Sequence, residues 1–582
     1  MGTNNLSRRD FVALTFNKTA APDRNPAVTP KDDPFFRKYA NREMPFKSAR
    51  TQTGLNLYGG AWTETEVLHL LRRTTFGASK AHVDSFKTMS LIDAVNRLID
   101  NPQFPSSSPL NVYENSYHDL QGCPFGTSWI EWSGTNDSDG MLNDFRTKRS
   151  FKQWWISVMI YQQPHILEKI TLFWANHFST QTEDFNYPKA IWQHYKKLRE
   201  GSLGNFRTLL KEITIDPHML LFLNGNLNSA SAPDENYARE LQELFTIGKG
   251  PASAYTEDDV KQAAKVLTGW RRQEQPDGFY TTIFNDAEHD TSDKQFSPFY
   301  NNTRITGKAG QDGQSETDDL LNMILATDEA AKYICRCLYR WFVYYVIDDS
   351  AEQNVIAPMA AIFRSSYEIA PVLKALFCSE HFFDMANRGC IIKSPVDLYI
   401  GFCREFNISL EKNYPDVYYD QWNYFWQICA ECGQNPGDPP NVAGWNAYYQ
   451  EPVYYEVWLS SDTIQKRARV MGVQTSTGMS IGSTLIKSDS ILFNKQFDHP
   501  EDPNAVVANF CKYLLPQDLT PDQVSYLKRS VLLTGQVSDS YWTSAWNNYI
   551  ANPGDPGSES VVRSRLDQLV NYITGIEEYQ LY

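Results

Sequence analysis

The sequence predicts an all-α protein, a large multi-helix body with long loop insertions and a minor β element. Helical periodicity recurs from Thr63 onward, whereas strand signals are few and the clearest lies at 279–284. No Gly-x-Gly-x-x-Gly motif or P-loop follows a strand signal, which argues against the common nucleotide-binding α/β folds. With 42% hydrophobic and 21% charged residues, the composition is that of a globular chain and excludes wholesale disorder.

Capping boxes, in which Ser or Thr precedes an acidic residue by three positions, mark several predicted helix starts. These boxes begin at Thr63, Ser231 and Thr256, and Gly77 and Gly248 close the helices that the first two open. Apolar residues then recur at spacings of three and four, so each box opens an amphipathic helix. Further helical segments are predicted at 141–174, 320–347, 394–406 and 563–579.

The chain is predicted to form a single large helical domain over 61–582, which an extended segment over 1–60 precedes. Stretches rich in polar residues, Pro or Gly interrupt the helices and are expected to be insertions, near 101–140, 273–313 and 474–504. The longest strongly apolar stretch, 338–347, contains Arg340. Because a bilayer span needs about 20 apolar residues, no membrane span is predicted.

The N-terminus contains Ser7-Arg8-Arg9-Asp10-Phe11-Val12, which resembles the start of a twin-arginine export signal. A working signal also needs an apolar region of about 7–15 residues. Here the apolar part runs only from Phe11 to Phe16, and Asn17 and Lys18 interrupt it. By this criterion the protein is predicted to stay in the cytoplasm.

The charge balance, 69 Asp and Glu against 54 Lys and Arg, gives a formal net charge of −15. No basic cluster offsets it locally, so nucleic acid is not expected as a partner. The nine cysteines are scattered through the chain, unlike those of a small disulfide-stabilised domain. Cys429 and Cys432 are the one tight pair; without a preceding strand or a second pair, buried thiols are favoured over a redox or zinc site.

The densest group of charged residues lies at 234–244. At 100° per residue, one side of this predicted helix carries Glu235, Asn236, Arg239, Glu240 and Glu243. One interpretation is a solvated face with salt bridges four residues apart. The other is a polar cleft, in which Arg239 and Asn236 bind an anionic substrate while Glu240 or Glu243 acts as metal ligand or base.

Histidines and tryptophans supply the other candidates. His177 ends a strongly apolar helix, where it serves as a structural hydrogen-bond donor or joins the acidic helix in a metal site. His289 and Asp290, with Lys294 four residues later, form either an acid–base pair or a turn. The tryptophans proposed to line a binding cleft are Trp270 and Trp445, although both positions also suit a core. A divalent metal is possible, but no paired-histidine motif identifies one.

A series of short sequence motifs, called phrases below, extends from Thr63 to the C-terminus. The longest is Asp234-Glu235-Asn236-Tyr237-Ala238-Arg239-Glu240, followed by Glu243-Leu244-Phe245-Thr246. The others are His69-Leu70-Leu71-Arg72-Arg73, Leu172-Phe173-Trp174 with Asn176-His177-Phe178, Gly204-Asn205-Phe206, Leu267-Thr268-Gly269-Trp270, His289-Asp290, Lys393-Ser394-Pro395 and Pro439-Pro440-Asn441-Val442 with Gly444-Trp445. Together these phrases resemble the bacterial family known as domain of unknown function 1800.

This resemblance implies a large, mostly helical protein whose activity is not established. Many family members carry export signals, which implies a periplasmic or exported location. Their genes often lie beside those of a sulfatase-like family, domain of unknown function 1501, which implies such a protein as partner. The resemblance also implies that His177, Arg239, Glu240, His289 and Asp290 form one centre.

Two functional hypotheses follow. In the first, the protein is a helical scaffold or binding protein that acts with the sulfatase-like partner, and its polar centre is a structural network. In the second, it is a metal-assisted or acid–base hydrolase acting on an extracellular polymer or its decorations. In that case Glu240 is base or ligand, His177 is ligand or acid, Arg239 clamps an anion, and His289 and Asp290 belong to a lid.

Overall fold

Helices make up most of the chain in the computed structural model, which describes residues 33–37, 51–113, 123–132, 140–183 and 185–582. Within these ranges the strands form three two-stranded antiparallel sheets. The predicted all-α body with a minor β element is therefore confirmed. The same ranges contain no helix long and apolar enough to cross a membrane. The Arg8-Arg9 segment lies outside the described residues.

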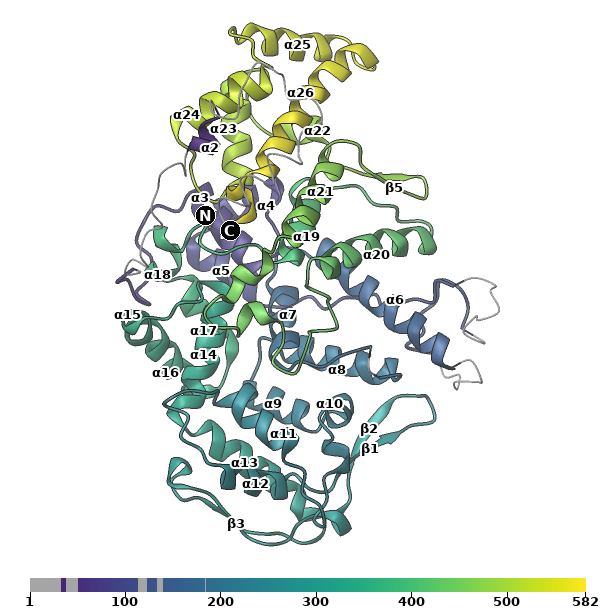
Figure 1. The fold of residues 1–582 in the computed structure, drawn as a ribbon, viewed down its shortest axis with the longest axis vertical. Helices are drawn as coiled ribbons and strands as arrows, with labels where there is room; N and C mark the ends of the chain where they lie inside the picture. Colours follow the sequence, from purple (N-terminus) through teal and green to yellow (C-terminus); the bar gives the residue numbers. More distant parts are fainter. Residues whose placement is uncertain (1–32, 38–50, 114–122, 133–139, 184) are drawn as a thin grey trace, which may run out of the picture.

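The helices form an elongated stack, with three groups of helices that overlap in height along its long axis and are called tiers below (Figure 1). In the upper tier, Phe35 of the short helix α2 (Pro34–Arg37) packs its ring against Tyr526 and Tyr572. The N-terminal part of the described chain thus contacts the C-terminal helices. This tier comprises α21 (Thr463–Thr475), α22 (Ser490–Asn494), α23 (Pro503–Leu514), α24 (Pro521–Tyr526), α25 (Ser540–Ala551) and α26 (Pro556–Gly575).

The middle tier brings together the first helices of the body and helices from its second half. It comprises α3 (Glu64–Thr74), α4 (Lys80–Lys87), α5 (Leu91–Ile99), α6 (Gly140–Tyr161), α7 (Leu167–His177), α14 (Asp328–Phe342), α15 (Asp349–Ala351), α16 (Ala357–Ser366), α17 (Ile369–Phe377), α18 (Glu380–Phe383), α19 (Pro395–Glu405) and α20 (Pro415–Glu431). Gly77, just after α3, has φ of +74° and lies against the backbone of Gly401 in α19. A β-carbon at Gly77 would lie 2.7 Å from the Gly401 carbonyl oxygen, so position 77 needs glycine.

The lower tier contains most of the residues that the sequence marks as functional. Its helices are α8 (Pro188–Gly201), α9 (Phe206–Thr214), α10 (Pro217–Phe222), α11 (Glu235–Glu240), α12 (Glu257–Val266) and α13 (Ser315–Leu325). Its sheets are β1 (Trp270–Glu274) with β2 (Tyr280–Phe284), and β3 (Lys294–Gln295) with β4 (Arg304–Ile305). Strand β2 matches the strand predicted at 279–284 to within one residue. The third sheet, β5 (Met479–Ile481) with β6 (Thr484–Ile486), lies higher in the molecule.

The capping boxes at Thr63 and Thr256 form as predicted, and each satisfies two backbone N–H groups at the start of α3 and α12. The box predicted at Ser231 is wrong. Residues 229 and 232 pair in a tight turn instead, and the side chain of Asp234 caps α11 by accepting the N–H of Asn236. The helix therefore begins three residues later than its sequence indicates.

Two of the helical segments predicted from periodicity, 141–174 and 320–347, are each divided in two. The segment at 141–174 consists of α6 and α7, and Pro164 lies in the break between them. Proline supplies no N–H and disfavours helical geometry in the residue before it. The segment at 320–347 consists of α13 and α14, because the Thr327 side chain accepts the N–H of Ala330 and starts a new helix.

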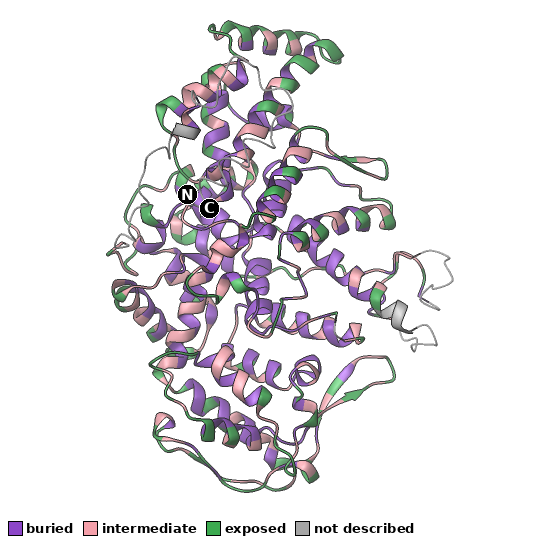
Figure 2. Ribbon diagram, viewed as in Figure 1, coloured by how far each residue is buried: buried purple, intermediate pink, exposed green. Residues whose placement is uncertain are grey.

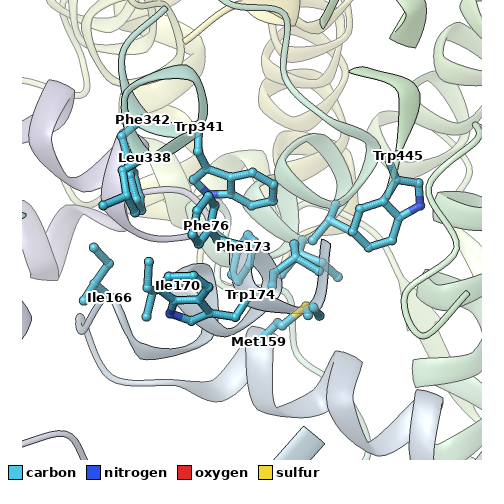
Figure 3. Close-up of a cluster of buried hydrophobic side chains, with 14 of the residues drawn as sticks. Phe76, Met159, Ile166, Ile170, Phe173, Trp174, Leu338, Trp341, Phe342 and Trp445 are labelled. Atoms are coloured by element: carbon cyan, nitrogen blue, oxygen red, sulfur yellow. The ribbon is translucent and has the colours of Figure 1, made fainter. Parts of the chain in front are cut away.

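Helix α7 lies at the centre of the middle tier, and all of its residues are buried (Figure 2). Its Ile170, Phe173 and Trp174 belong to an apolar cluster that also receives Trp341 from α14 and Trp445 from the loop after α20 (Figure 3). Burial of such side chains stabilises the fold by roughly 25 cal/mol per Å² of apolar surface. This one helix therefore holds distant segments of the chain together.

Two adjacent charges on α7 are also buried and are neutralised by different neighbours. The Glu168 carboxylate accepts Nε and Nη2 of Arg199 on α8, at 2.7 and 3.1 Å, and Nε1 of Trp155 on α6, at 2.9 Å. Lys169 pairs with Asp397 on α19. Because charges buried in this way require partners, these contacts fix how α6, α8 and α19 pack on α7.

We expect Glu168→Gln to lower the free energy of unfolding by about 3–5 kcal/mol, because it leaves the Arg199 guanidinium buried without its counter-charge. Urea unfolding followed by circular dichroism measures the change. The matched control is Glu200→Gln on α8, whose partner Lys196 is about half exposed and whose loss should cost less than about 1 kcal/mol. Equal losses in the two variants would contradict the structural role of the buried pair.

Candidate functional site

The helical segment 235–246, which carries the longest motif of the family resemblance, changes geometry in its middle. The α-helical turns of α11 end at Glu240, and a π-helix continues from Leu241 to Thr246. A π-helix is wider than an α-helix, and such turns occur often at functional sites. Because the turn widens at Leu241, side chains beyond it no longer follow 100° spacing. Glu243 accordingly pairs with Lys249 rather than with Arg239 four residues before it.

Arg239 joins two helices of the lower tier. Its guanidinium donates to both carboxylate oxygens of Glu257 on α12, at 2.8 and 2.7 Å, and to Glu235 at 3.1 Å. These hydrogen bonds raise the pKa of Arg239. Asn236, on the same side, donates its amide to the Leu223 carbonyl at 3.4 Å. This geometry is that of a salt-bridged face between α11 and α12.

Glu240 is half-buried and differs from its neighbours. Burial raises the pKa of its carboxyl group, and the nearby charge of Glu243 raises it further, against the opposing effects of Lys249 and Arg239. Tyr255 lies close enough to Glu240 and Glu243 for their charges to raise its own pKa, which burial already elevates. Glu240 therefore takes up a proton more readily than a glutamate in water does.

His177, the last residue of α7, contacts the apolar side of the helical segment that carries Arg239 and Glu240. Its ring is buried against Phe173, Trp174 and Phe178, and Nε2 donates to the Phe245 carbonyl at 3.0 Å. Burial lowers the pKa of His177 to about 4, so the ring is neutral at pH 7. This hydrogen bond joins the end of α7 to the end of the π-helix.

The structure does not bring the five residues of the expected centre together. His177 faces the buried side of the Asp234–Gly248 segment, whereas Arg239 faces Glu257 on the other side. The physical reason is the amphipathic pattern of the segment, which turns its apolar side toward α7 and its charged side toward α12. His289 and Asp290 make separate contacts, with Glu316 and Thr268.

His289 belongs to a fully buried group of charges. Its Nε2 lies 3.1 Å from Oε1 of Glu316, and its Nδ1 lies 3.0 Å from the Thr268 carbonyl. The Thr268 hydroxyl also lies 3.1 Å from Nδ1, so both ring nitrogens have partners within the protein. Lys294 donates to the other oxygen of Glu316 at 2.6 Å. Although burial raises the pKa of Glu316, the hydrogen bonds from His289 and Lys294 hold it below its usual value.

Asp290 is not the partner of His289. Its carboxylate accepts the backbone N–H of Ser292 at 2.8 Å and also the Ser292 hydroxyl, as in a turn. The carboxylate that pairs with His289 is Glu316, in the first turn of α13. Sequence reasoning missed Glu316 because it lies 27 residues from His289 and no local pattern links the two.

An open cleft of about 880 Å³ lies in the lower tier, beside this group. Glu316 accepts the backbone N–H of Lys308 at 2.6 Å, and the neighbouring Thr317 accepts Nε1 of Trp270 at 3.0 Å. The buried charges therefore hold one wall of the cleft in place. The cleft is lined by Lys211, Ile215, Trp270, Thr282, Lys308, Gln311, Asp312, Gln314, Ser315 and Asp318. Trp270 lines the cleft, but most of its side chain is buried in a small apolar cluster with Leu220 and Phe284.

Trp445 lies elsewhere, in the apolar cluster around α7 (Figure 3). Its backbone N–H donates to Oδ1 of Asn176 at 2.8 Å, and its side chain is buried. Gly444 (φ +88°) packs so closely on Asn176 that a β-carbon would lie 2.3 Å from Oδ1. Of the two alternatives for this turn, the structure favours the cap on the body.

A metal centre is not preformed in the described part of the chain, where no three His, Cys, Asp or Glu side chains are grouped to hold an ion. Cys429 and Cys432 are both buried, and burial raises the pKa of both thiols. Cys432 lies 3.2 Å from the Tyr399 hydroxyl. A raised pKa disfavours the reactive thiolate, so these cysteines fit the expected buried thiols.

Sequence reasoning also missed a second buried group at the start of α10. Asp216 caps that helix and accepts Nδ1 of His194 at 3.1 Å and Nζ of Lys197 at 2.7 Å. His218 stacks edge-on against His194, with ring centroids 5.4 Å apart, and both of its nitrogens are buried without a hydrogen-bond partner. Burial, followed by the effect of His194, lowers the pKa of His218 to about 3.

We expect His218→Phe to leave the free energy of unfolding unchanged or to raise it by about 1 kcal/mol, because the variant removes two unsatisfied buried nitrogens. His194→Phe is the matched control and should be destabilising, since Asp216 then loses a donor. Urea unfolding at pH 7 measures both. A loss of more than about 2 kcal/mol for His218→Phe would show that its nitrogens bind a partner such as buried water.

We expect Glu240→Gln to stabilise the protein by about 0.2–0.5 kcal/mol at pH 7, the usual cost of a like-charge pair on a helix. Because the pKa of Glu240 is raised by folding, its ionised form opposes folding as the pH rises through that pKa. The gain should therefore vanish near pH 4. Glu257→Gln should show the opposite sign, since Arg239 lowers the pKa of that carboxyl group. Thermal unfolding between pH 4 and 8 tests both.

A family model described as "Protein of unknown function (DUF1800)" matches residues 69–581, nearly the whole chain. Neither the curated proteins nor the solved structures include a match. The matched range contains the salt bridges of Arg239, the buried group of His289, Lys294 and Glu316, and the cleft beside Trp270. The chain therefore belongs to the DUF1800 family of proteins of unknown function.

Proposed function

We propose that this protein is a helical binding protein whose ligand occupies the open cleft beside Trp270. The observation that carries this proposal is the cleft itself, at about 880 Å³. Small-molecule and cofactor sites usually measure about 300–1,000 Å³ and combine apolar surface with a few convergent polar groups. Ile215 and the small exposed part of the largely buried Trp270 supply apolar surface here, and Gln311, Gln314 and Asp312 supply polar groups.

The rigidity of the cleft wall supports the same role. Glu316, His289 and Lys294 have fully buried side chains and connect the loop before β3 to the first turn of α13. Through the N–H of Lys308, Glu316 also fixes the start of the segment that lines the cleft. A preformed site loses less entropy on binding, so rigid walls favour affinity.

A second part of this proposal concerns a protein that acts together with this one. Family resemblance points to a sulfatase-like protein of the domain of unknown function 1501 family, and a binding protein is a suitable companion for such an enzyme. The ligand of the cleft would then be material that the partner acts on. This part of the proposal depends on the resemblance alone.

A hydrolase acting on an extracellular polymer is the second candidate function, and Glu240 is the observation that favours it. A half-buried carboxyl group with a raised pKa, beside a second carboxyl group in Glu243, is the usual setting of a general acid. Arg239 is less suited to clamping an anionic substrate, because Glu257 and Glu235 already engage its guanidinium. A divalent metal would need ligands beyond those grouped in the described part of the chain.

A thermal-shift screen with sugars, peptides, nucleotides and inorganic anions tests the binding role. A ligand at 100 times its Kd stabilises the folded state by about 2.7 kcal/mol and raises Tm. We expect at least one compound to do so for the parent protein and not for Gln314→Trp, which places a bulky indole in the cleft. The control is Gln568→Trp in a separate cleft on α26. If every Tm shift survives Gln314→Trp, the cleft is not the binding site.

A further inference from the structure

We propose that the side-chain amine of Lys393 is a modification site, at which carbon dioxide adds to form a carbamate. Lys393 lies just before α19, in the phrase Lys393-Ser394-Pro395. The proposal is independent of the cleft beside Trp270 and of the binding function proposed for it. It rests on the burial of this amine and on the charges around it.

Lys393 is a buried lysine without a counter-ion. The residue is 5% exposed, and within the described ranges its Nζ has neither an ion pair nor a hydrogen bond. Nζ lies instead over the ring of Tyr579, 3.9 Å from the ring centroid, and such a contact replaces only part of the hydration that a buried ammonium loses. Burial lowers the pKa of Lys393 to about 8, against the opposing effect of Glu405, so part of the population is the neutral, nucleophilic amine at pH 7.5.

The carboxylates near Lys393 do not offset the cations there. The charges that act on its amine are those of Glu405, Arg72, Asp397 and Arg467. Asp397 already binds Lys169 of α7. The ammonium and the two guanidiniums therefore share one remaining carboxylate, that of Glu405, and buried charges left in excess are costly.

The hydrogen bonds that Arg72 and Arg467 make in the described part of the chain all go to neutral acceptors. Arg72 donates to the Leu515 carbonyl at 2.8 Å. Arg467 donates to the Lys393 carbonyl at 2.9 Å and to Oε1 of Gln580 at 3.3 Å. An anion formed at Lys393 would thus lie near two guanidiniums that have no carboxylate of their own, and their charges would stabilise it.

Addition of carbon dioxide corrects this imbalance of charge. The ammonium first gives one proton to solvent, and the lone pair of the neutral amine attacks the carbon of CO2. A C–N bond forms, the electron pair of one C=O bond moves to oxygen, and the nitrogen releases a second proton to solvent. The side chain changes from one positive to one negative charge, so two guanidiniums then lie near two anions. CO2 is also small and uncharged, which suits an amine with so little exposure.

Carbon-13 NMR of the full chain in ¹³C-labelled bicarbonate at pH 7.5 tests this proposal. We expect a carbamate signal that is lost in Lys393→Arg, which keeps the positive charge but cannot add CO2. Lys148→Arg is the matched control, because Lys148 is equally buried but donates Nζ to the carbonyls of Glu183 and Phe185. This variant should keep the signal.

Chemical trapping locates the carbamate without a variant and decides the case in which Lys393→Arg fails to fold. Triethyloxonium converts a carbamate into a stable ethyl carbamate, which peptide mass spectrometry detects. We expect the label on the peptide that contains Lys393. No carbamate signal in the parent protein, a signal that folded Lys393→Arg retains, or a trapped label that this peptide lacks would each overturn the proposal.

Discussion

The complete burial of α7 is the constraint on which the rest of the structure depends. A helix surrounded on all sides needs neighbours for every face, and here these come from α6, α8, α14, α19 and the loop after α20. Its two buried charges add a requirement that apolar packing lacks. Glu168 and Lys169 each need an oppositely charged side chain within hydrogen-bonding distance. Arg199, 31 residues after Glu168, and Asp397, 228 residues after Lys169, meet that requirement. The packing of the middle tier is thus specified by charge as well as by shape.

The polar residues of the lower tier follow the same rule. Arg239 connects α11 to α12, His177 connects α7 to the π-helix, and His289 connects the β1–β2 region to α13 through Glu316. Each of these side chains has hydrogen-bond partners within the protein, which is the usual condition for a polar group in a folded interior. A residue pattern rich in His, Arg and Glu can therefore mark the framework that positions a site rather than the site itself. The cleft beside Trp270 is bounded by this framework. The amides and carboxylates that line it lie outside the motifs on which the family resemblance rests.

Much of the fold could be predicted from the sequence because its signals are local. The capping boxes at Thr63 and Thr256, the strand near Tyr280 and the apolar periodicity each involve residues a few positions apart. Predictions were wrong where a neighbouring contact competed with such a signal. The turn at 229–232 displaced the box at Ser231, Pro164 divided a long helical segment, and the π-helix at Leu241 moved Glu243 away from the Arg239 face.

The sequence by itself determined the helical class and the membership of the chain in its family, because composition and short motifs suffice for these. Only the tertiary structure decided which charged groups meet. Glu316 pairs with His289 across 27 positions, and Asp397 pairs with Lys169 across 228. No periodicity encodes such pairs, since they depend on how whole helices pack. For the same reason the cleft beside Trp270, which takes residues from α9, β1, β2 and α13, emerged only when those elements were placed in space.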